Sequence, residues 1–220
     1  MSNLPVFIDQ KSSQVPAFLQ EESGGAGREN ITSDMQSTPT LKLLQPLSRE
    51  VTSGEYPALN WLLMDDVHES LYVSLLSVRR SFDLWYKRNS AKDGNAGHYE
   101  TREDAEAALE ENPDKAMLEI QETLILIGIT YDEEGIGVPF QMFVSKTSLF
   151  PVKKMLTKAN LLCEKIGGWP LYALVWNLRI KKESNTKGTW GTPEFDLVGQ
   201  VDDEQIFDEL KNCYSNIVQG

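Results

Sequence analysis

The chain has 220 residues and a formal net charge of -12, and its 40% hydrophobic and 25% charged residues are ordinary for a globular protein. No apolar run reaches the roughly 18 residues that a membrane-spanning helix needs, and the N-terminal sequence has no signal-peptide pattern. The two cysteines, Cys163 and Cys213, have no pairing motif, so we expect a cytoplasmic protein with free thiols and no membrane contact.

Residues 1–37 are predicted to form a flexible N-terminal arm. They are polar and rich in Gly and Ser, and such sequences bury too little apolar surface to offset the entropy of ordering. A folded domain over residues 38–220 is expected to follow, because apolar residues become frequent from Pro39 onward.

Most of this domain is predicted to be β-structure. Residues 71–87 are rich in β-formers but too long for one flat strand, so we expect a bend or a bulge there. Residues 119–131 and 137–145 flank a turn and predict a hairpin. Residues 169–182 and 188–200 predict a second hairpin.

Three helices are predicted between and after these strands. Residues 101–112 begin with Thr101 as N-cap, residues 148–168 form an amphipathic pattern with Pro151 in the first turn, and residues 202–220 close the chain. The mixture predicts an α+β fold around a mainly antiparallel sheet. An OB-like barrel is the alternative, because short strands around a helix can close in several ways.

The sequence lacks the signatures of an enzyme. Its two histidines, His68 and His98, have no ligand-spaced partners, so no metal is expected. It has no phosphate-binding Gly-rich loop and no nucleophile motif. We therefore expect no catalysis and no cofactor.

Charge is distributed very unevenly along the chain. Residues 71–92 hold five basic and one acidic side chain, a balance of +4, and residues 142–190 hold nine and two, a balance of +7. Residues 93–134 balance to -11 and residues 194–220 to -6. Because salt screens distant charges, the basic segments can form a cationic groove on an acidic molecule.

The stretch from Arg79 to Arg88, RRSFDLWYKR, combines cations with aromatic rings. Alternation along a strand places both kinds of side chain on each face. Single-stranded nucleic acid needs this combination, because cations hold phosphates and rings stack on unpaired bases. The alternative is a half-buried strand whose rings fill the core. The candidate DNA-binding residues here are Arg79, Arg80, Phe82, Trp85, Tyr86, Lys87 and Arg88.

Two later segments add further basic residues. Lys154, Lys158 and Lys165 share one face of the predicted amphipathic helix, which is either a nucleic-acid surface or an ordinary solvated face. The second hairpin either closes over DNA or is an edge protected by lysines. The candidate binding residues of these two segments are Lys154, Lys158, Arg179, Lys181, Lys182, Lys187 and Trp190.

The order of these elements resembles a known phage family. The segments ENITSDMQSTPTLKLLQPLSREV and SLYVSLLSVRRSFDLWYKRN, followed by a basic helix and a Trp-bearing hairpin, resemble phage-encoded single-stranded-DNA-binding proteins of podophages. Within them, the likeness is to the Drc group, the RNA-polymerase cofactors of Schitoviridae-type phages. The resemblance runs from about Glu29 onward. It implies preferential binding of single-stranded DNA, recruitment of a phage RNA polymerase to melted promoters, and a fold unlike the standard OB barrel.

The sequence therefore predicts a non-enzymatic, sequence-tolerant single-stranded-DNA-binding protein of a phage, acting in the cytoplasm of the infected bacterial host. Its expected partners are single-stranded DNA, a phage RNA polymerase and further copies of itself. The alternative is a protein-interaction module, an acidic DNA mimic or polymerase regulator, that uses the acidic segments and does not bind DNA. The acidic C-terminal helix is suited to contact basic partners, or simply packs by its apolar face.

Overall fold

The computed structural model describes residues 37–88, 90–132, 135–165, 167–186 and 188–219. The predicted flexible arm, residues 1–37, lies outside the described residues except for Ser37. The described chain is α+β with mainly antiparallel sheets, which confirms the predicted fold class.

The larger sheet contains both predicted hairpins. Its strand order is β7-β6-β4-β8-β9, and β5 pairs with β4 beside this path. Every pairing between its strands is antiparallel. The strands are β4 (Leu71–Tyr86), β5 (Asn95–Tyr99), β6 (Leu118–Asp132), β7 (Gly135–Ser145), β8 (Leu174–Asn185) and β9 (Gly188–Gln200).

A smaller sheet near the beginning of the described chain was not predicted. It contains three short strands in the order β1-β2-β3, namely β1 (Leu41–Leu43), β2 (Trp61–Leu63) and β3 (Asp66–His68). The one-turn helix α2 (Arg49–Thr52) lies between β1 and β2. Three-residue strands carry too short a pattern to stand out in a sequence.

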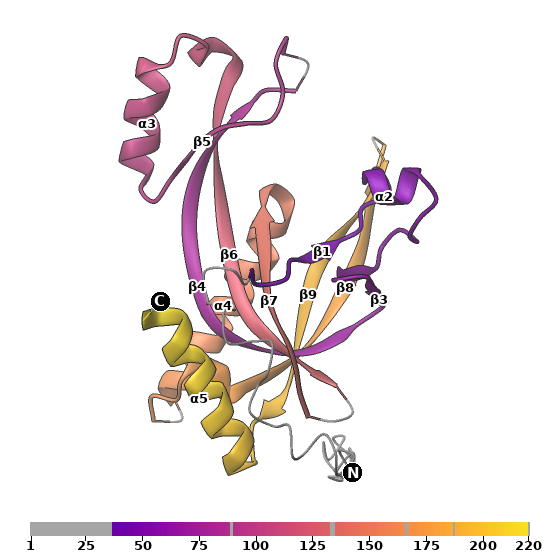
Figure 1. The fold of residues 1–220 in the computed structure, drawn as a ribbon, viewed down its shortest axis with the longest axis vertical. Coiled ribbons are helices and arrows are strands. Elements are labelled where there is room, and N and C mark those ends of the chain that lie inside the picture. The colour runs from indigo at the N-terminus through magenta and orange to yellow at the C-terminus, as the bar shows by residue number, and fades with distance from the viewer. Residues whose placement is uncertain (1–36, 89, 133–134, 166, 187, 220) are drawn as a thin grey trace, which may run out of the picture.

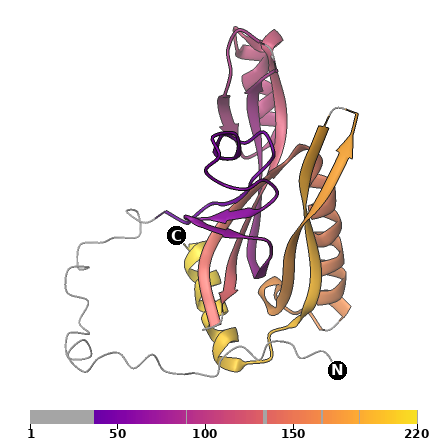
Figure 2. The same ribbon diagram turned by 90° about the vertical axis from the view of Figure 1, so that its right-hand side faces the viewer.

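The predicted bend in the long strand is present. β4 pairs with β8 only through Leu71–Val73, and its register with β6 shifts between Leu75 and Ser77, where a bulge bends the strand. Beyond the bulge, β4 and β6 rise together and carry β5 and α3, as Figures 1 and 2 show. We call this part the β4–β6 arm. The β8–β9 hairpin rises separately on the other side and is called the β8–β9 arm.

The three predicted helices are present, together with α2. Thr101 caps the first of them as expected, since its Oγ1 accepts a hydrogen bond from the Asp104 amide at 3.1 Å. No described helix has the length and apolar character needed to cross a membrane. The helices are α3 (Arg102–Glu111), α4 (Leu149–Lys165) and α5 (Glu204–Gln219), with 3₁₀ turns η2 (Lys115–Met117), η3 (Lys146–Ser148) and η4 (Leu171–Ala173).

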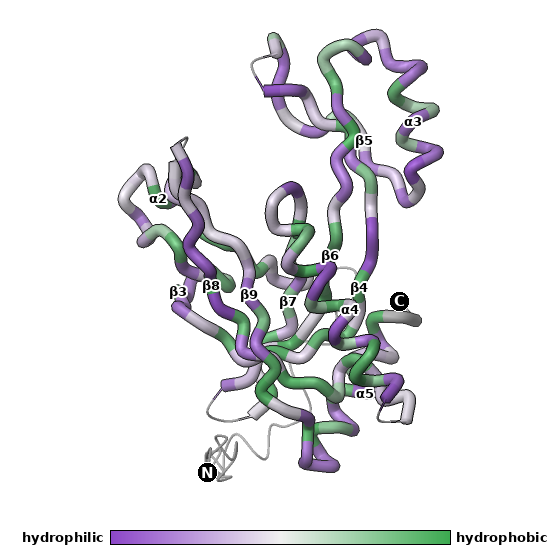
Figure 3. The backbone as a smooth tube through the Cα atoms, turned by 180° about the vertical axis from the view of Figure 1, so that it is seen from behind, coloured by the Kyte–Doolittle hydropathy of each residue, from purple (hydrophilic) through white to green (hydrophobic). Residues whose placement is uncertain are grey.

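Two apolar clusters hold these elements together. The larger one joins β1 and β2 to the main sheet and to α4, and Trp61 and Trp176 are fully buried in it. The smaller one lies under α5, where Leu210 packs with Leu76 and Tyr172. The arms extend beyond these clusters, and the upper part of β8 is hydrophilic, as Figure 3 shows.

Residues 38–45 span the gap between the two edge strands of the main sheet. No ladder joins β7 to β9 among the described residues, so the sheet does not close as a barrel. Thr40 forms a parallel bridge with Gln141 of β7, and Gln45 hydrogen-bonds the Gly191 backbone of β9. We call residues 38–45 the strap.

Candidate functional site

A groove of about 810 Å³ lies between the two arms, above the strap and the end of β7. Arg88 lines it from the β4–β6 arm, and Thr189 and Trp190 line it from the β8–β9 arm. The turn η3, which precedes α4, completes its floor. Its described lining is Thr40, Leu41, Lys42, Leu43, Gln45, Pro46, Leu47, Trp61, Arg88, Met142, Phe143, Val144, Ser145, Lys146, Thr147, Ser148, Thr189, Trp190 and Pro193.

The charged side chains in this lining are all basic. They are Lys42, Arg88 and Lys146, and no described lining residue carries a carboxylate. Lys42 pairs with Glu50 of α2. Neither Arg88 nor Lys146 forms an ion pair with any carboxylate of the described residues. The groove is therefore a local positive region on a protein whose net charge is -12.

Aromatic rings lie beside these cations. Phe143 is 54% exposed although it is large and apolar. The indole nitrogens of Trp61 and Trp190 are buried and have no hydrogen-bond acceptor among the described residues. Buried donors normally have acceptors, so these two N–H groups are unusual, but their burial keeps them from the open surface of the groove.

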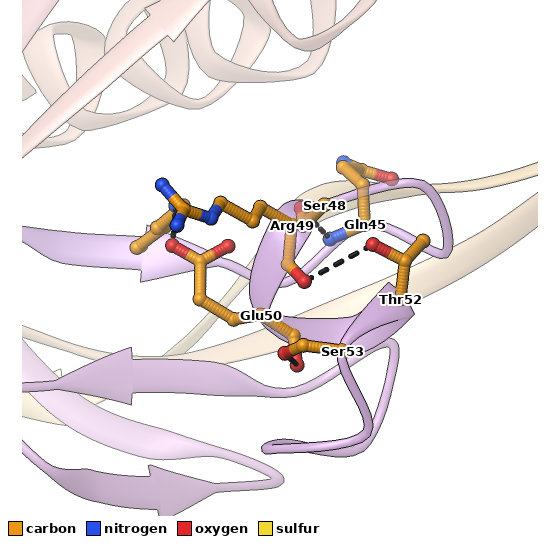
Figure 4. A network of polar contacts seen from close by, with 7 residues as sticks. Gln45, Ser48, Arg49, Glu50, Thr52 and Ser53 are labelled. Atoms are coloured by element: carbon orange, nitrogen blue, oxygen red, sulfur yellow. Dashed lines mark hydrogen bonds and ion pairs between the residues drawn. The ribbon is translucent and has the colours of Figure 1, made fainter.

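The groove depends on the strap for its shape. The Gln45 side chain donates to Gly191 O at 2.9 Å and accepts from Gly191 N at 2.8 Å, which fixes the strap to the residue after Trp190. A Cβ on Gly191 would lie 2.9 Å from Ile180 Cγ2, so only glycine fits. The backbone N–H of Gln45 donates to Ser48 Oγ at 3.0 Å, at the start of α2 (Figure 4).

A second hollow, which we call the side pocket, adjoins the groove. It measures about 500 Å³ and lies between α4 and the β8–β9 arm, and Thr147 and Pro193 line both hollows. Three predicted binding residues, Lys154, Lys158 and Lys181, line it. Five predicted residues are thus brought together, since Arg88 and Trp190 line the groove.

The remaining predicted residues on and just after β4 contact other parts of the protein instead of lining the hollows. Arg79 donates to Ile217 O at 3.1 Å and Lys87 donates to Ala116 O at 2.8 Å. The Arg80 guanidinium lies 5.3 Å from the centre of the Phe82 ring. Phe82 itself is only 5% exposed, so it offers little surface for a base to stack on.

The burial of Phe82 has a clear physical origin. Alternate side chains of a strand point to opposite faces, yet the consecutive residues Ser81, Phe82, Asp83 and Leu84 are all buried. In this part of the arm β5 and β6 pair with β4, and α3 packs against all three strands, so this stretch of β4 lies inside the arm. Asp83 is buried with His98 Nδ1 at 2.7 Å and Thr123 Oγ1 at 2.8 Å.

Trp85 and Tyr86 are half-buried near the end of this arm. The Tyr86 hydroxyl donates to Asp114 Oδ2 at 2.8 Å, and Lys92 also donates to that carboxylate. The hydrogen bond from Lys92, followed by that from Tyr86, lowers the pKa of the Asp114 carboxyl. These contacts tie the strand end to the connection after α3.

The predicted cations of the second hairpin are also divided. Arg179 pairs with Glu194 at 3.5 Å and with Asp196. Lys182 is exposed opposite Gly191, and it lines neither of the two hollows. Lys187 lies outside the described residues.

Sequence reasoning missed Phe143, Lys146 and Phe150, which line the two hollows. Phe150 is 78% exposed at the first turn of α4. Lys146 has a positive φ of 52°, a backbone conformation that residues other than glycine rarely adopt outside turns. All three residues lie in the basic segment 142–190, whose charge balance was the signal available for this region.

The described residues contain no group of His, Cys, Asp and Glu side chains suited to a metal ion. Burial raises the pKa of both cysteine thiols, which favours their protonated form.

The fold and the two hollows define an α+β protein that presents a cationic, ring-lined groove between two β-arms. The chain belongs to the Pam3 phage gp34-like protein family, whose family model matches residues 9–220, and it is therefore a phage protein. No curated protein and no solved structure matches the chain.

Proposed function

We propose that this phage protein binds single-stranded nucleic acid in the groove and does so without catalysis. Phosphates bind near Arg88 and Lys146, and unpaired bases stack against Phe143 and Trp190. The observation that carries the proposal is the lining of the groove, which has the unpaired cations Arg88 and Lys146 and the exposed Phe143 ring but no described carboxylate.

The strand order supports the same proposal. Numbered along the chain, the five long strands lie in the order third, second, first, fourth and fifth, with α4 between the third and the fourth. This is the order of the OB fold opened between its third and fifth strands, which agrees with the unclosed sheet. OB proteins bind oligonucleotides between the connections that follow their first and fourth strands. Arg88 and Thr189 flank those two connections here, and both line the groove.

The proposal is tested by fluorescence anisotropy with a labelled single-stranded oligonucleotide of about 20 nucleotides and the matching duplex. We expect the single strand to bind more tightly, and its affinity to fall steeply between about 50 and 200 mM salt. Polyglutamate of similar charge is the control for simple polyanion binding. Equal affinity for strand and duplex, or for polyglutamate, would contradict the proposal.

We also propose a protein partner for the β4–β6 arm. Helix α3 lies at the end of this arm and buries only Ala105, and it exposes Glu103, Asp104, Glu106, Glu110 and Glu111. The resemblance to Drc nominates a phage RNA polymerase, recruited to melted promoters in the host cytoplasm, as the basic partner. The other partner that single-stranded-DNA-binding proteins imply is a second copy of this chain on the same DNA strand. Such self-association would also serve replication.

This second proposal is tested by pull-down of purified phage RNA polymerase with the wild type and with the variant E103K/E111K. We expect the variant to lose the polymerase and to keep oligonucleotide binding, because no α3 residue lines the groove. Retention of the polymerase by the variant would rule out α3. Light scattering with and without DNA measures self-association.

A further inference from the structure

The side pocket continues the groove along helix α4. Thr147 and Pro193 belong to both linings, so the two hollows are neighbours on the molecule. The side pocket differs from the groove because its two walls carry opposite charges.

The α4 wall presents a ring followed by two cations. Phe150, Lys154 and Lys158 follow one another at intervals of four residues, which places them on one face of the helix. Phe150 is 78% exposed, and the neighbouring Pro151 restricts the backbone that carries it. Lys158 Nζ lies 6.0 Å from the centre of the buried Trp176 ring, which holds the lysine close to the sheet.

The opposite wall is acidic. Glu183, Glu194 and Asp196 line it, with Lys181 at 3.1 Å from Glu183 and Arg179 paired to the other two. A simple polyanion does not suit such a pocket. A nucleotide does, because its phosphate is anionic whereas the amino groups of its base donate hydrogen bonds to carboxylates.

We propose that the side pocket is a second nucleotide subsite, which binds a nucleotide of the same strand that occupies the groove. The base stacks on Phe150, with its amino edge toward the β9 carboxylates, and the phosphate binds Lys154 and Lys158. The subsite rests on the proposed function of the groove. It adds that α4 is part of the binding surface, so the strand extends beyond the two arms.

The test compares Phe150→Ser with wild type on oligodeoxycytidines of about 4 and about 12 nucleotides, the shorter one fitting within the groove alone. We expect the variant to bind the longer strand about tenfold more weakly, as for the loss of one stacked base, and the shorter strand unchanged. Leu161→Ser is the matched control, because Leu161 is 61% exposed on α4 but does not line the pocket. Phe150→Trp keeps a ring and should restore the wild-type affinity.

The outcomes separate the two proposals. If the wild type binds both strands and Phe150→Ser binds the longer one equally well, the subsite is overturned and the groove is not. A loss of equal size on both strand lengths also overturns it, since the effect would then not depend on reaching the side pocket. If the wild type binds neither strand, the function of the groove fails, and the subsite fails with it.

Discussion

The basic residues of the β4–β6 arm and those of the groove differ in what they contact. Arg79 and Lys87 on the arm donate to the main-chain carbonyls of Ile217 and Ala116. Arg88 and Lys146 in the groove have no ion-pair partner in the described part of the chain. The same residue types thus stabilise the fold in one region and remain available to a ligand in the other. The available partner, rather than the residue type, distinguishes a structural cation from a binding one.

The aromatic rings of the two regions differ in exposure, since Phe82 of the arm is buried and Phe143 of the groove is half-exposed. The substitution Phe82→Ala tests this difference and should have the largest effect. Phe82 is 5% exposed, so its removal should cost about 3–5 kcal/mol of the free energy of unfolding in urea. Phe143→Ala is the control, because a half-exposed ring should cost much less. A Phe82→Ala protein of unchanged stability that binds oligonucleotides poorly would instead make Phe82 a stacking ring.

The base of the β4–β6 arm should be sensitive to alkaline pH, unlike the solvated groove. The Tyr131 hydroxyl lies 2.8 Å from Ser74 Oγ, and burial raises the pKa of Tyr131 to about 12. The folded state favours the neutral Tyr131 hydroxyl. Its contribution to the free energy of unfolding is therefore complete below pH 10 and is lost as the pH rises toward about 12. The loss should be about 2–3 kcal/mol. The free energy of unfolding of wild type and of Tyr131→Phe is compared from pH 9 to about 12. It should decline more steeply with pH in wild type. Parallel curves would refute the role of Tyr131.

Asp83 is the acidic residue inside the basic stretch, and its role is structural. Asp83→Ala removes the partner of His98 and Thr123 and should cost about 1–3 kcal/mol of unfolding free energy. Hydrogen exchange should quicken in β5, which Asp83 helps to hold on β4. The exposed Asp93→Ala is the matched control. Equal exchange in the two variants would show that Asp83 does not anchor the arm.

Loosening the strap should change the groove more than the β4–β6 arm. Gln45→Met keeps the side-chain length but loses both hydrogen bonds to Gly191, which should cost about 1–2 kcal/mol. Oligonucleotide affinity should fall as well, because Trp190 loses its fixed neighbour. Gln205→Met removes an exposed helix contact and serves as the control. If Gln45→Met lowers stability but leaves affinity unchanged, the strap does not position the groove.

Patterns of many residues were predictable from the sequence. A periodic pattern over ten or more residues marks both long hairpins, the capped helix at Thr101 and the amphipathic helices α4 and α5. The bulge in β4 was also predictable, because sixteen residues rarely form one flat strand. The three-residue strands of the small sheet carry too little pattern to be seen.

The site was less predictable because it depends on long-range contacts. Arg79 and Arg88 look alike in sequence, but Arg79 meets the end of α5 and Arg88 faces the groove. Phe143 looks like a core residue of a strand, yet it is half-exposed because it lies on an edge strand beside the strap. Gln45 and Gly191 are 146 positions apart, so no local pattern relates them.

The most direct test measures how oligonucleotide affinity depends on salt in two double variants of equal charge change. Arg88→Ala/Lys146→Ala removes the groove cations, and Arg79→Ala/Lys87→Ala removes the cations bonded to carbonyls. Each phosphate contact contributes about 0.7 to the slope of log affinity against log salt, so the groove variant should lose about 1.4 from that slope. The arm variant should keep the wild-type slope. The opposite result, a lower slope in the arm variant and an unchanged slope in the groove variant, would contradict the account.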